Sequence, residues 1–217
     1  KKIPGKEDFQ HTINYFSYQL AKYQVDIHLN TAGHPSLLEE FDEVVVATGI
    51  KPRVPDIPGI HHPKVLSYID VITGRHTPGQ RVAIIGAGGI GFDVAEWLTH
   101  DKNNSALDEE FLNEWGIDLE GEYRGGIKPA ELSPSPREVY LLQRKKAKLG
   151  QNLGKTTGWI HRLSLKHKKV QMFSGVHYER IDDEGLHLSI QDKKQCLAVD
   201  NIIICAGQTE LKELYKP

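Results

Sequence analysis

Residues 81–98, RVAIIGAGGIGFDVAEWL, constrain the fold of this chain more than any other stretch. The short apolar run at residues 82–85 is typical of a buried parallel strand. A G-x-G-x-x-G turn follows it, and apolar residues then recur with helical spacing at Val94, Ala95 and Leu98. A strand, a glycine turn and a helix in this order are what a dinucleotide-binding unit requires. The sequence therefore predicts an α/β fold built around a Rossmann-like unit.

The glycines of this turn have separate predicted roles. Gly86 permits the tight turn, and Gly91 lets the helix lie close to the strand. Gly88, with Gly89 beside it in the same turn, lets a pyrophosphate approach the backbone without a Cβ in the way. The pyrophosphate would then contact the free N–H groups and the positive dipole end of the helix. The alternative is a glycine-rich strand-to-helix turn that binds no ligand.

The residues that follow the next predicted strand, 138–142, bear on which nucleotide is bound. An NAD site has an acidic residue there, which holds the ribose 2′-hydroxyl. This chain has Gln143, Arg144, Lys145 and Lys146 instead. The planar fork of Arg144 and the point charges of Lys145 and Lys146 are suited to a 2′-phosphate. The pattern favours NADP over NAD, and a solvated basic loop is the alternative.

Charge and cysteine content exclude several other classes. The 217 residues carry a net charge of −2, so no overall field attracts nucleic acid or a membrane surface. No run is long and apolar enough for a membrane span. Cys196 and Cys205 are too few for a disulfide framework or a zinc site, and both lie in apolar runs that predict buried thiols. The histidines have no metal-ligand spacing, so we expect no metal site. Together with the net charge and the lack of a long apolar run, this leads us to expect no nucleic acid or membrane partner.

The remaining elements follow from periodicity and composition. Before the glycine turn, the sequence predicts an amphipathic packing helix, two strands, an extended proline-rich crossover and a short helix, at residues 7–23, 25–29, 42–49, 52–63 and 65–72. After it, residues 100–136 are a predicted insertion that Phe111 and Trp115 pin onto the domain. A helix with Trp159 facing inward, a small antiparallel layer and a closing buried strand follow, at residues 154–168, 171–199 and 201–207.

Two strands that end in small-residue turns flank the dinucleotide unit. One ends at Ala47, Thr48 and Gly49, and the other ends at Gly207. This layout resembles the flavoprotein disulfide reductases, in which an NAD(P) domain is inserted into an FAD domain. It implies an α/β fold with a Rossmann-like NADP domain inserted into an incomplete FAD domain. The implied division is a partial FAD-domain segment with the crossover, the NAD(P)-binding domain, and the start of the return to the FAD domain, at residues 1–73, 74–207 and 208–217.

Four segments make the resemblance more specific. They are IPGK, HPKVLSY, NEWGID and GKTTGWIHR, at residues 3–6, 62–68, 113–118 and 154–162. Together they resemble the C-terminal part of the bacterial NADPH-dependent 2,4-dienoyl-CoA reductases, over essentially the whole chain. The resemblance implies a cytoplasmic flavoprotein of auxiliary fatty-acid β-oxidation. In that family, electrons pass from NADPH to FAD, to an iron–sulfur cluster, to FMN and then to the dienoyl-CoA.

In that family the FMN, the cluster and the substrate lie in an N-terminal β/α barrel, which this sequence does not contain. The chain opens at Lys1 rather than Met, so we expect a piece of a longer protein. The resemblance implies an electron-entry fragment whose partner is that barrel. It implies NADP(H) binding here, FAD binding in the full-length parent, and no catalytic acid or base. We expect the isolated chain to be inactive.

The resemblance also assigns roles by position. Gly86, Gly88 and Gly91 match the pyrophosphate turn, and Arg144 with Lys145 matches the 2′-phosphate site. Gly207 matches a position beside the bound dinucleotide, whereas Ala47, Thr48 and Gly49 match the FAD-side turn. Asp93 matches an acidic residue that faces the nicotinamide, and the alternative is a helix N-terminal acid favoured by the dipole.

Two other functions stay open. One is a relative of trimethylamine dehydrogenase, whose corresponding domain no longer uses a pyridine nucleotide. The intact glycine turn and Arg144 argue against it. The other is a nucleotide-binding module without turnover.

Overall fold

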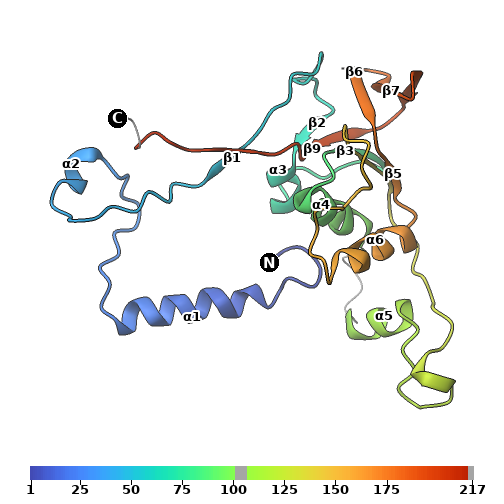
Figure 1. Cartoon of the computed structure of the whole chain (residues 1–217), viewed down its shortest axis with the longest axis horizontal. Helices are drawn as coiled ribbons and strands as arrows, with labels where there is room; N and C mark the ends of the chain where they lie inside the picture. Colours follow the sequence, from blue (N-terminus) through green and yellow to red (C-terminus); the bar gives the residue numbers. More distant parts are fainter. Residues whose placement is uncertain (101–106, 215–217) are drawn as a thin grey trace.

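A five-stranded parallel sheet is the centre of the computed structural model, which describes residues 1–100 and 107–214 (Figure 1). Its strand order is β2-β9-β3-β4-β5. The strands are β2 (Val65–Ser67), β3 (Arg81–Ile85), β4 (Glu138–Leu142), β5 (Gln171–Phe173) and β9 (Asn201–Ile204). The central strand β3 pairs in parallel with β4 on one side and β9 on the other. The predicted buried parallel strand is therefore confirmed.

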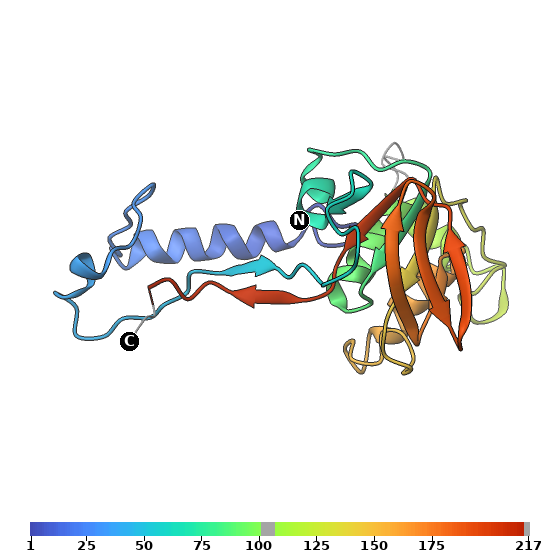
Figure 2. The ribbon, with the colours of Figure 1, turned by 90° about the horizontal axis from the view of Figure 1, so that it is seen from above.

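The two faces of this sheet carry different layers. Val82 and Ile84 of β3 pack into a core with the helices α3 (Tyr68–Thr73), α4 (Gly89–Thr99) and α6 (Gly158–His167). Ala83 and Ile85, which alternate with them, pack against an antiparallel sheet. That sheet comprises β6 (Val176–Asp182), β7 (Gly185–Ile190) and β8 (Lys193–Leu197), and Figure 2 shows it covering the parallel sheet.

Several predicted elements differ in detail from the structure. Residues 65–72 form the edge strand β2 before the short helix α3, because β2 pairs with β9. Residues 171–173 join the parallel sheet through β4 instead of the antiparallel layer. The helix α6 begins at Gly158, and its buried apolar residue is Leu165; Trp159, predicted to face inward, is 53% exposed.

The N-terminal segment projects from the body of the molecule (Figures 1 and 2). It contains α1 (Phe9–Lys22), α2 (Pro35–Leu38) and β1 (Ile50–Pro52), and β1 pairs only with β10 (Gln208–Glu210). The strands predicted at residues 25–29 and 42–49 are absent from this described segment. A strand forms by pairing with a neighbour. At the end of the second run the Leu211 N–H donates to the Gly49 carbonyl oxygen at 3.1 Å, whereas Val45 is 90% exposed.

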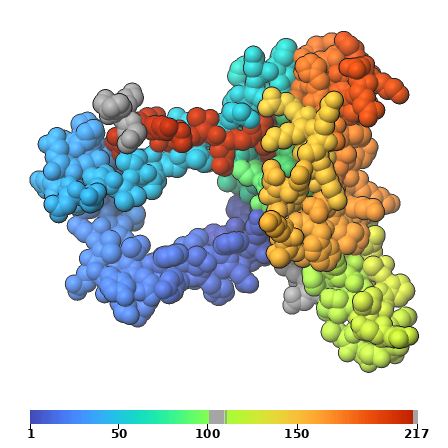
Figure 3. All heavy atoms as spheres, in the orientation of Figure 1, coloured from blue at the N-terminus to red at the C-terminus, as the bar shows by residue number. Residues whose placement is uncertain are grey.

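The helix α1 forms as predicted but buries no side chain among the described residues. Its apolar face is exposed, including Phe9, Ile13 and Phe16. Figure 3 shows an opening between α1 and the β1–β10 ribbon. Three contacts fix the start of this segment to the body. Ile3 is buried in the helix-side core, the Lys6 ammonium lies 2.6 Å from the Asp93 carboxylate on α4, and Lys2 Nζ donates to the Thr73 carbonyl oxygen at 3.4 Å.

The predicted insertion at residues 100–136 contains α5 (Leu107–Glu114) and η1 (Arg124–Gly126); residues 101–106 lie outside the described part. Trp115 attaches it to α6, with its ring centroid 6.2 Å from that of Trp159 and 5.9 Å from that of His167. The Glu114 carboxylate adds a largely buried contact, 3.7 Å from both His167 Nδ1 and Lys168 Nζ. The predicted pinning by Trp115 is confirmed, whereas Phe111 contacts Trp115 and stays 54% exposed.

Among the helices that the structure describes, none is both long and apolar enough to cross a membrane.

We expect Trp115→Ala to release the insertion from α6, because it removes both ring contacts. Loss of about 1–2 kcal/mol of docking free energy would raise the detached population about 5- to 30-fold. Limited proteolysis within residues 107–136 measures this change. Tyr123→Ala is the matched control, since its ring is half exposed and lies in the same insertion. Equal cleavage rates in the two variants would contradict the assigned attachment.

Candidate functional site

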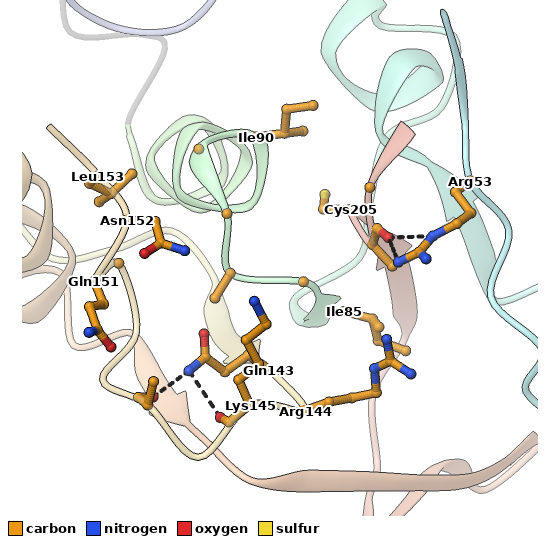
Figure 4. Close-up of a pocket in the computed structure, with 18 of the residues that line it drawn as sticks. Arg53, Ile85, Ile90, Gln143, Arg144, Lys145, Gln151, Asn152, Leu153 and Cys205 are labelled. Atoms are coloured by element: carbon orange, nitrogen blue, oxygen red, sulfur yellow. Dashed lines mark hydrogen bonds between the residues drawn. The ribbon is translucent and has the colours of Figure 1, made fainter. Parts of the chain in front are cut away.

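A cavity of about 610 Å³ opens where the carboxyl ends of β3, β4 and β9 meet the start of α4. Ligands of open parallel sheets bind at this edge, and the volume lies within the usual range of about 300–1,000 Å³ for small-molecule pockets. Figure 4 shows Gln151, Asn152 and Leu153 on one flank of the glycine turn and Arg53 with Cys205 on the other. Gly86, Gly88, Gly89, Arg144, Lys145 and Gly207 all line this cavity, so the structure brings these predicted residues together.

Two of the glycines are required by the fold itself. Gly86 has φ +115°, and a Cβ there would lie 2.2 Å from the Cys205 carbonyl oxygen. A Cβ at position 91 would lie 1.9 Å from the Gly86 carbonyl oxygen. Both distances are far below van der Waals contact, so only glycine lets β3, β9 and α4 approach this closely.

No clash with the protein's own backbone requires glycine at positions 88 and 89. A Cβ at either position would have no described atom within 4 Å, and Gly88 has an extended backbone at φ −84° and ψ −172° that any residue adopts. Gly88 is also the N-cap of α4, and no side chain caps this helix. The first N–H groups of α4 are therefore available at the cavity, and the missing Cβ atoms leave room for a ligand to approach them.

The loop after β4 forms the basic wall of the cavity. The Gln143 side chain braces it by donating hydrogen bonds to the carbonyl oxygens of Lys145, at 3.1 Å, and Ala147. Lys148, which the sequence analysis did not single out, lines the cavity together with Arg144 and Lys145. Within the described part of the chain, the Arg144 guanidinium has no hydrogen bond or ion pair, so its donors are available to an anion.

Tyr178 on β6 is a second polar group that sequence reasoning missed. Its hydroxyl is buried at the cavity and has no hydrogen-bond partner among the described residues. Burial raises the pKa of Tyr178 well above its usual value, and the positive charge of Arg144 opposes that shift. An unpartnered buried hydroxyl costs about 1–3 kcal/mol, which a ligand oxygen beside Arg144 would recover. Only the packing of the antiparallel sheet places this side chain here, so spacing alone gives no signal for it.

Arg53 holds the turn that contains Gly207. Its guanidinium donates to the Ala206 carbonyl oxygen from Nε, at 2.9 Å, and from Nη2, and its backbone N–H donates to the Gly207 carbonyl oxygen at 2.9 Å. Gly207 has φ +105°, a conformation that favours glycine. The crossover segment therefore shapes one wall of the cavity, which the sequence analysis did not anticipate.

The two cysteines have different environments. Cys205 is buried at the cavity wall, and burial raises the pKa of its thiol to about 12. The prediction that Cys196 is buried is wrong: β8 is the edge strand of the antiparallel sheet, and Cys196 is exposed there.

The other predicted site residues lie apart from this cavity. Asp93, in the first turns of α4, is outside the lining and pairs with Lys6. Ala47, Thr48 and Gly49 line a second cavity of about 480 Å³ on the projecting segment, where Thr48 Oγ1 donates to the Leu211 carbonyl oxygen at 2.6 Å. Lys212, from the segment after β10, also lines this second cavity.

Comparisons with known proteins agree with the geometry. A family model described as pyridine nucleotide-disulphide oxidoreductase matches residues 8–216. A metal reductase of Desulforamulus reducens is 29% identical over 98% of the chain, and a cinnamate reductase of Clostridium sporogenes is 24% identical over 98% of it. The chain spans only 32% and 28%, respectively, of the length of these relatives.

Solved structures share the fold. A 2-naphthoyl-CoA reductase in complex with 2-naphthoyl-CoA matches 98% of the chain and 27% of its own length, with a TM-score of 0.72 and 23% identity. The 6-hydroxypseudooxynicotine amine oxidase of Pseudomonas geniculata N1 matches 99% of the chain and 29% of its own length, with a TM-score of 0.67 and 19% identity. At these identities the likeness supports the fold alone.

Adding one methyl group is expected to change the free energy of unfolding by very different amounts at the two kinds of glycine. Gly91→Ala places a Cβ against the Gly86 carbonyl oxygen and is expected to lower the free energy of unfolding by about 3 kcal/mol. Gly88→Ala meets open space and is expected to change it by less than about 1 kcal/mol. Urea titration of both variants measures the difference. A Gly88→Ala variant as unstable as Gly91→Ala would contradict the open cradle.

Proposed function

Because the chain belongs to the pyridine nucleotide-disulphide oxidoreductase family, we propose that it is the NADPH-binding portion through which electrons enter a flavoprotein reductase. Membership of this family implies binding of FAD and NAD(P)H. The choice of NADPH rests on one observation: the Arg144 guanidinium and the Tyr178 hydroxyl both line the cavity, and neither has a hydrogen-bond partner among the described residues. A 2′-phosphate would accept hydrogen bonds from both groups, with Lys145 adding charge.

Each part of the proposed site does one task. The N-terminus of α4 and the Cβ-free positions Gly88 and Gly89 hold the pyrophosphate. Gly207, held by Arg53, would lie beside the dinucleotide, and Asp93, four residues into α4, is the proposed acidic residue on the nicotinamide side. The bound NADPH would supply a hydride to a flavin. These protein groups bind and orient the cofactor, and no protein acid or base is needed for that transfer.

For the whole protein, we propose a cytoplasmic 2,4-dienoyl-CoA reductase of fatty-acid β-oxidation. The four segments that resemble this family support the assignment, and so does similarity to a reductase named for cinnamate. In this proposal residues 74–207 are the NADP domain, and residues 1–73 and 208–217 belong to an FAD domain, with Ala47, Thr48 and Gly49 on its FAD side. The partner is an N-terminal β/α barrel that carries FMN and an iron–sulfur cluster.

We expect Arg144→Ala to weaken NADPH binding about 10- to 100-fold while leaving NADH binding nearly unchanged, because it removes charge-assisted hydrogen bonds to the 2′-phosphate alone. Calorimetric titration at fixed salt measures both affinities. Lys146→Ala is the matched control, because it removes one positive charge from the same loop but Lys146 lies outside the cavity lining. Equal losses for the two nucleotides, or equal effects of the two substitutions, would refute the 2′-phosphate site.

We also expect the isolated chain to bind NADPH without oxidising it in the presence of an artificial electron acceptor, because in this proposal residues 1–73 and 208–217 are only part of the FAD domain. Absorbance of NADPH over time measures turnover. Gly88→Ala is expected to abolish the binding while the fold persists. Sustained NADPH oxidation by this chain alone would disprove its role as an entry fragment.

A further inference from the structure

Four polar side chains gather on the outer face of the antiparallel sheet, away from the nucleotide cavity. Asp182 ends β6, Glu184 lies in the β6–β7 turn, His187 is on β7 and Cys196 is on β8. His187 and Cys196 are directly opposite each other in the strand register. Leu186 and Leu188, on either side of His187, are fully buried, so alternation along β7 places the imidazole on the opposite face.

The potential ligand atoms converge on one ring nitrogen. His187 Nε2 lies 2.8 Å from Asp182 Oδ1, 3.7 Å from Cys196 Sγ and 3.7 Å from Glu184 Oε2. The ligand atoms of Glu184, His187 and Cys196 all lie within 4.8 Å of one another. In a tetrahedral zinc site with bonds of about 2.0–2.3 Å, neighbouring ligand atoms are about 3.3–3.7 Å apart. The two distances of 3.7 Å from His187 Nε2 match this spacing, whereas Asp182 Oδ1, at 2.8 Å, is at hydrogen-bond distance from the ring nitrogen.

A catalytic Cys–His–Asp arrangement does not fit these contacts. Such a triad uses both ring nitrogens, one for the nucleophile and one for the acid, whereas here Cys196 and Asp182 both face Nε2. Two carboxylates, Asp182 and Glu184, also lie beside His187 at this point. The same negative charges favour a cation at this point.

We propose that Asp182, Glu184, His187 and Cys196 form a binding site for a divalent ion of the zinc type. One thiolate, one imidazole and carboxylate oxygens are ligands that Zn²⁺ accepts. Binding moves the Nε2 proton of His187 to Nδ1, releases the thiol proton of Cys196 to solvent, and forms one nitrogen–metal and one sulfur–metal bond. Asp182 Oδ1 is a further carboxylate oxygen beside the imidazole, 2.8 Å from His187 Nε2.

The side chain of Arg180 now occupies part of this space. Its Nη2 lies 3.3 Å from His187 Nε2, and its Nε donates to Asp182 Oδ2 at 2.9 Å. Asp182 Oδ2 is a different oxygen from the one that faces His187. The half-exposed Arg180 can therefore leave the imidazole and keep its contact with the outer carboxylate oxygen when an ion enters.

An ion bound here would join the β6–β7 turn to β8. Asp183, in the same turn, already contacts the proline-rich crossover: its carbonyl oxygen accepts a hydrogen bond from Lys64 Nζ at 2.6 Å, and its carboxylate lies 3.2 Å from His62 Nε2. The proposed site would thus fix together three strands and the crossover whose Arg53 shapes the nucleotide cavity.

Titration with Zn²⁺ tests the proposal on the chain as it stands. We expect one ion to bind with a Kd at or below about 10 µM and Cys196→Ser or His187→Ala to weaken it at least about tenfold. His177→Ala is the matched control, because His177 is an exposed histidine on β6 of the same sheet. Both ligand substitutions are at the outer face, and circular dichroism verifies that the variants are folded.

Co²⁺ and a thiol reagent give independent readouts. With Co²⁺ we expect a sulfur-to-metal charge-transfer band that Cys196→Ser abolishes and His177→Ala retains. Zn²⁺ is expected to slow alkylation of Cys196, while the buried Cys205 stays unmodified and serves as the internal control. Binding that survives both ligand substitutions, or a Co²⁺ complex without the sulfur band, would overturn the proposal.

Discussion

The structure depends on the approach of the helix α4 to the carbonyl oxygen of Gly86. A single methyl group at position 91 would occupy the place of that oxygen, so the absence of a side chain sets the distance between the helix and the central strand. This contact places the first N–H groups of α4 so that they point toward the carboxyl edge of the sheet. The same edge receives the loop after β4 and the turn after β9, and the cavity is the space these three segments leave.

Burial on both faces of β3 links this edge to the rest of the molecule. Its side chains alternate between the helix layer and the antiparallel layer, so both layers pack against the same strand. Tyr178 reaches the cavity from the antiparallel layer, Asn152 from the loop before α6, and Arg53 from the crossover. The polar lining is therefore assembled by tertiary packing around a local glycine turn.

That division explains what the sequence could predict. The strand, glycine turn and helix were predictable because their signals are local, and so was the position of Arg144 and Lys145 after the next strand. Tyr178 and Arg53 carry no local signal, since layers distant in sequence bring them to the cavity. The strands predicted at residues 25–29 and 42–49 did not form. An apolar pattern indicates which side chains could be buried, but a strand also requires an adjacent strand for its backbone hydrogen bonds. Cys196 was expected in a core, yet an edge strand leaves it exposed.

The helix α1 has a consequence for how the molecule responds to heat or denaturant. It has 14 residues, and none of its side chains is buried against the described residues. An isolated helix of that length is only marginally stable in water, since most helix stability in proteins comes from a packed face. Unfolding of α1 is thus uncoupled from unfolding of the parallel sheet, and we expect α1 to be the less stable of the two. Backbone amides of α1 should then exchange with solvent through local fraying, while those of β3 exchange only when the whole sheet opens.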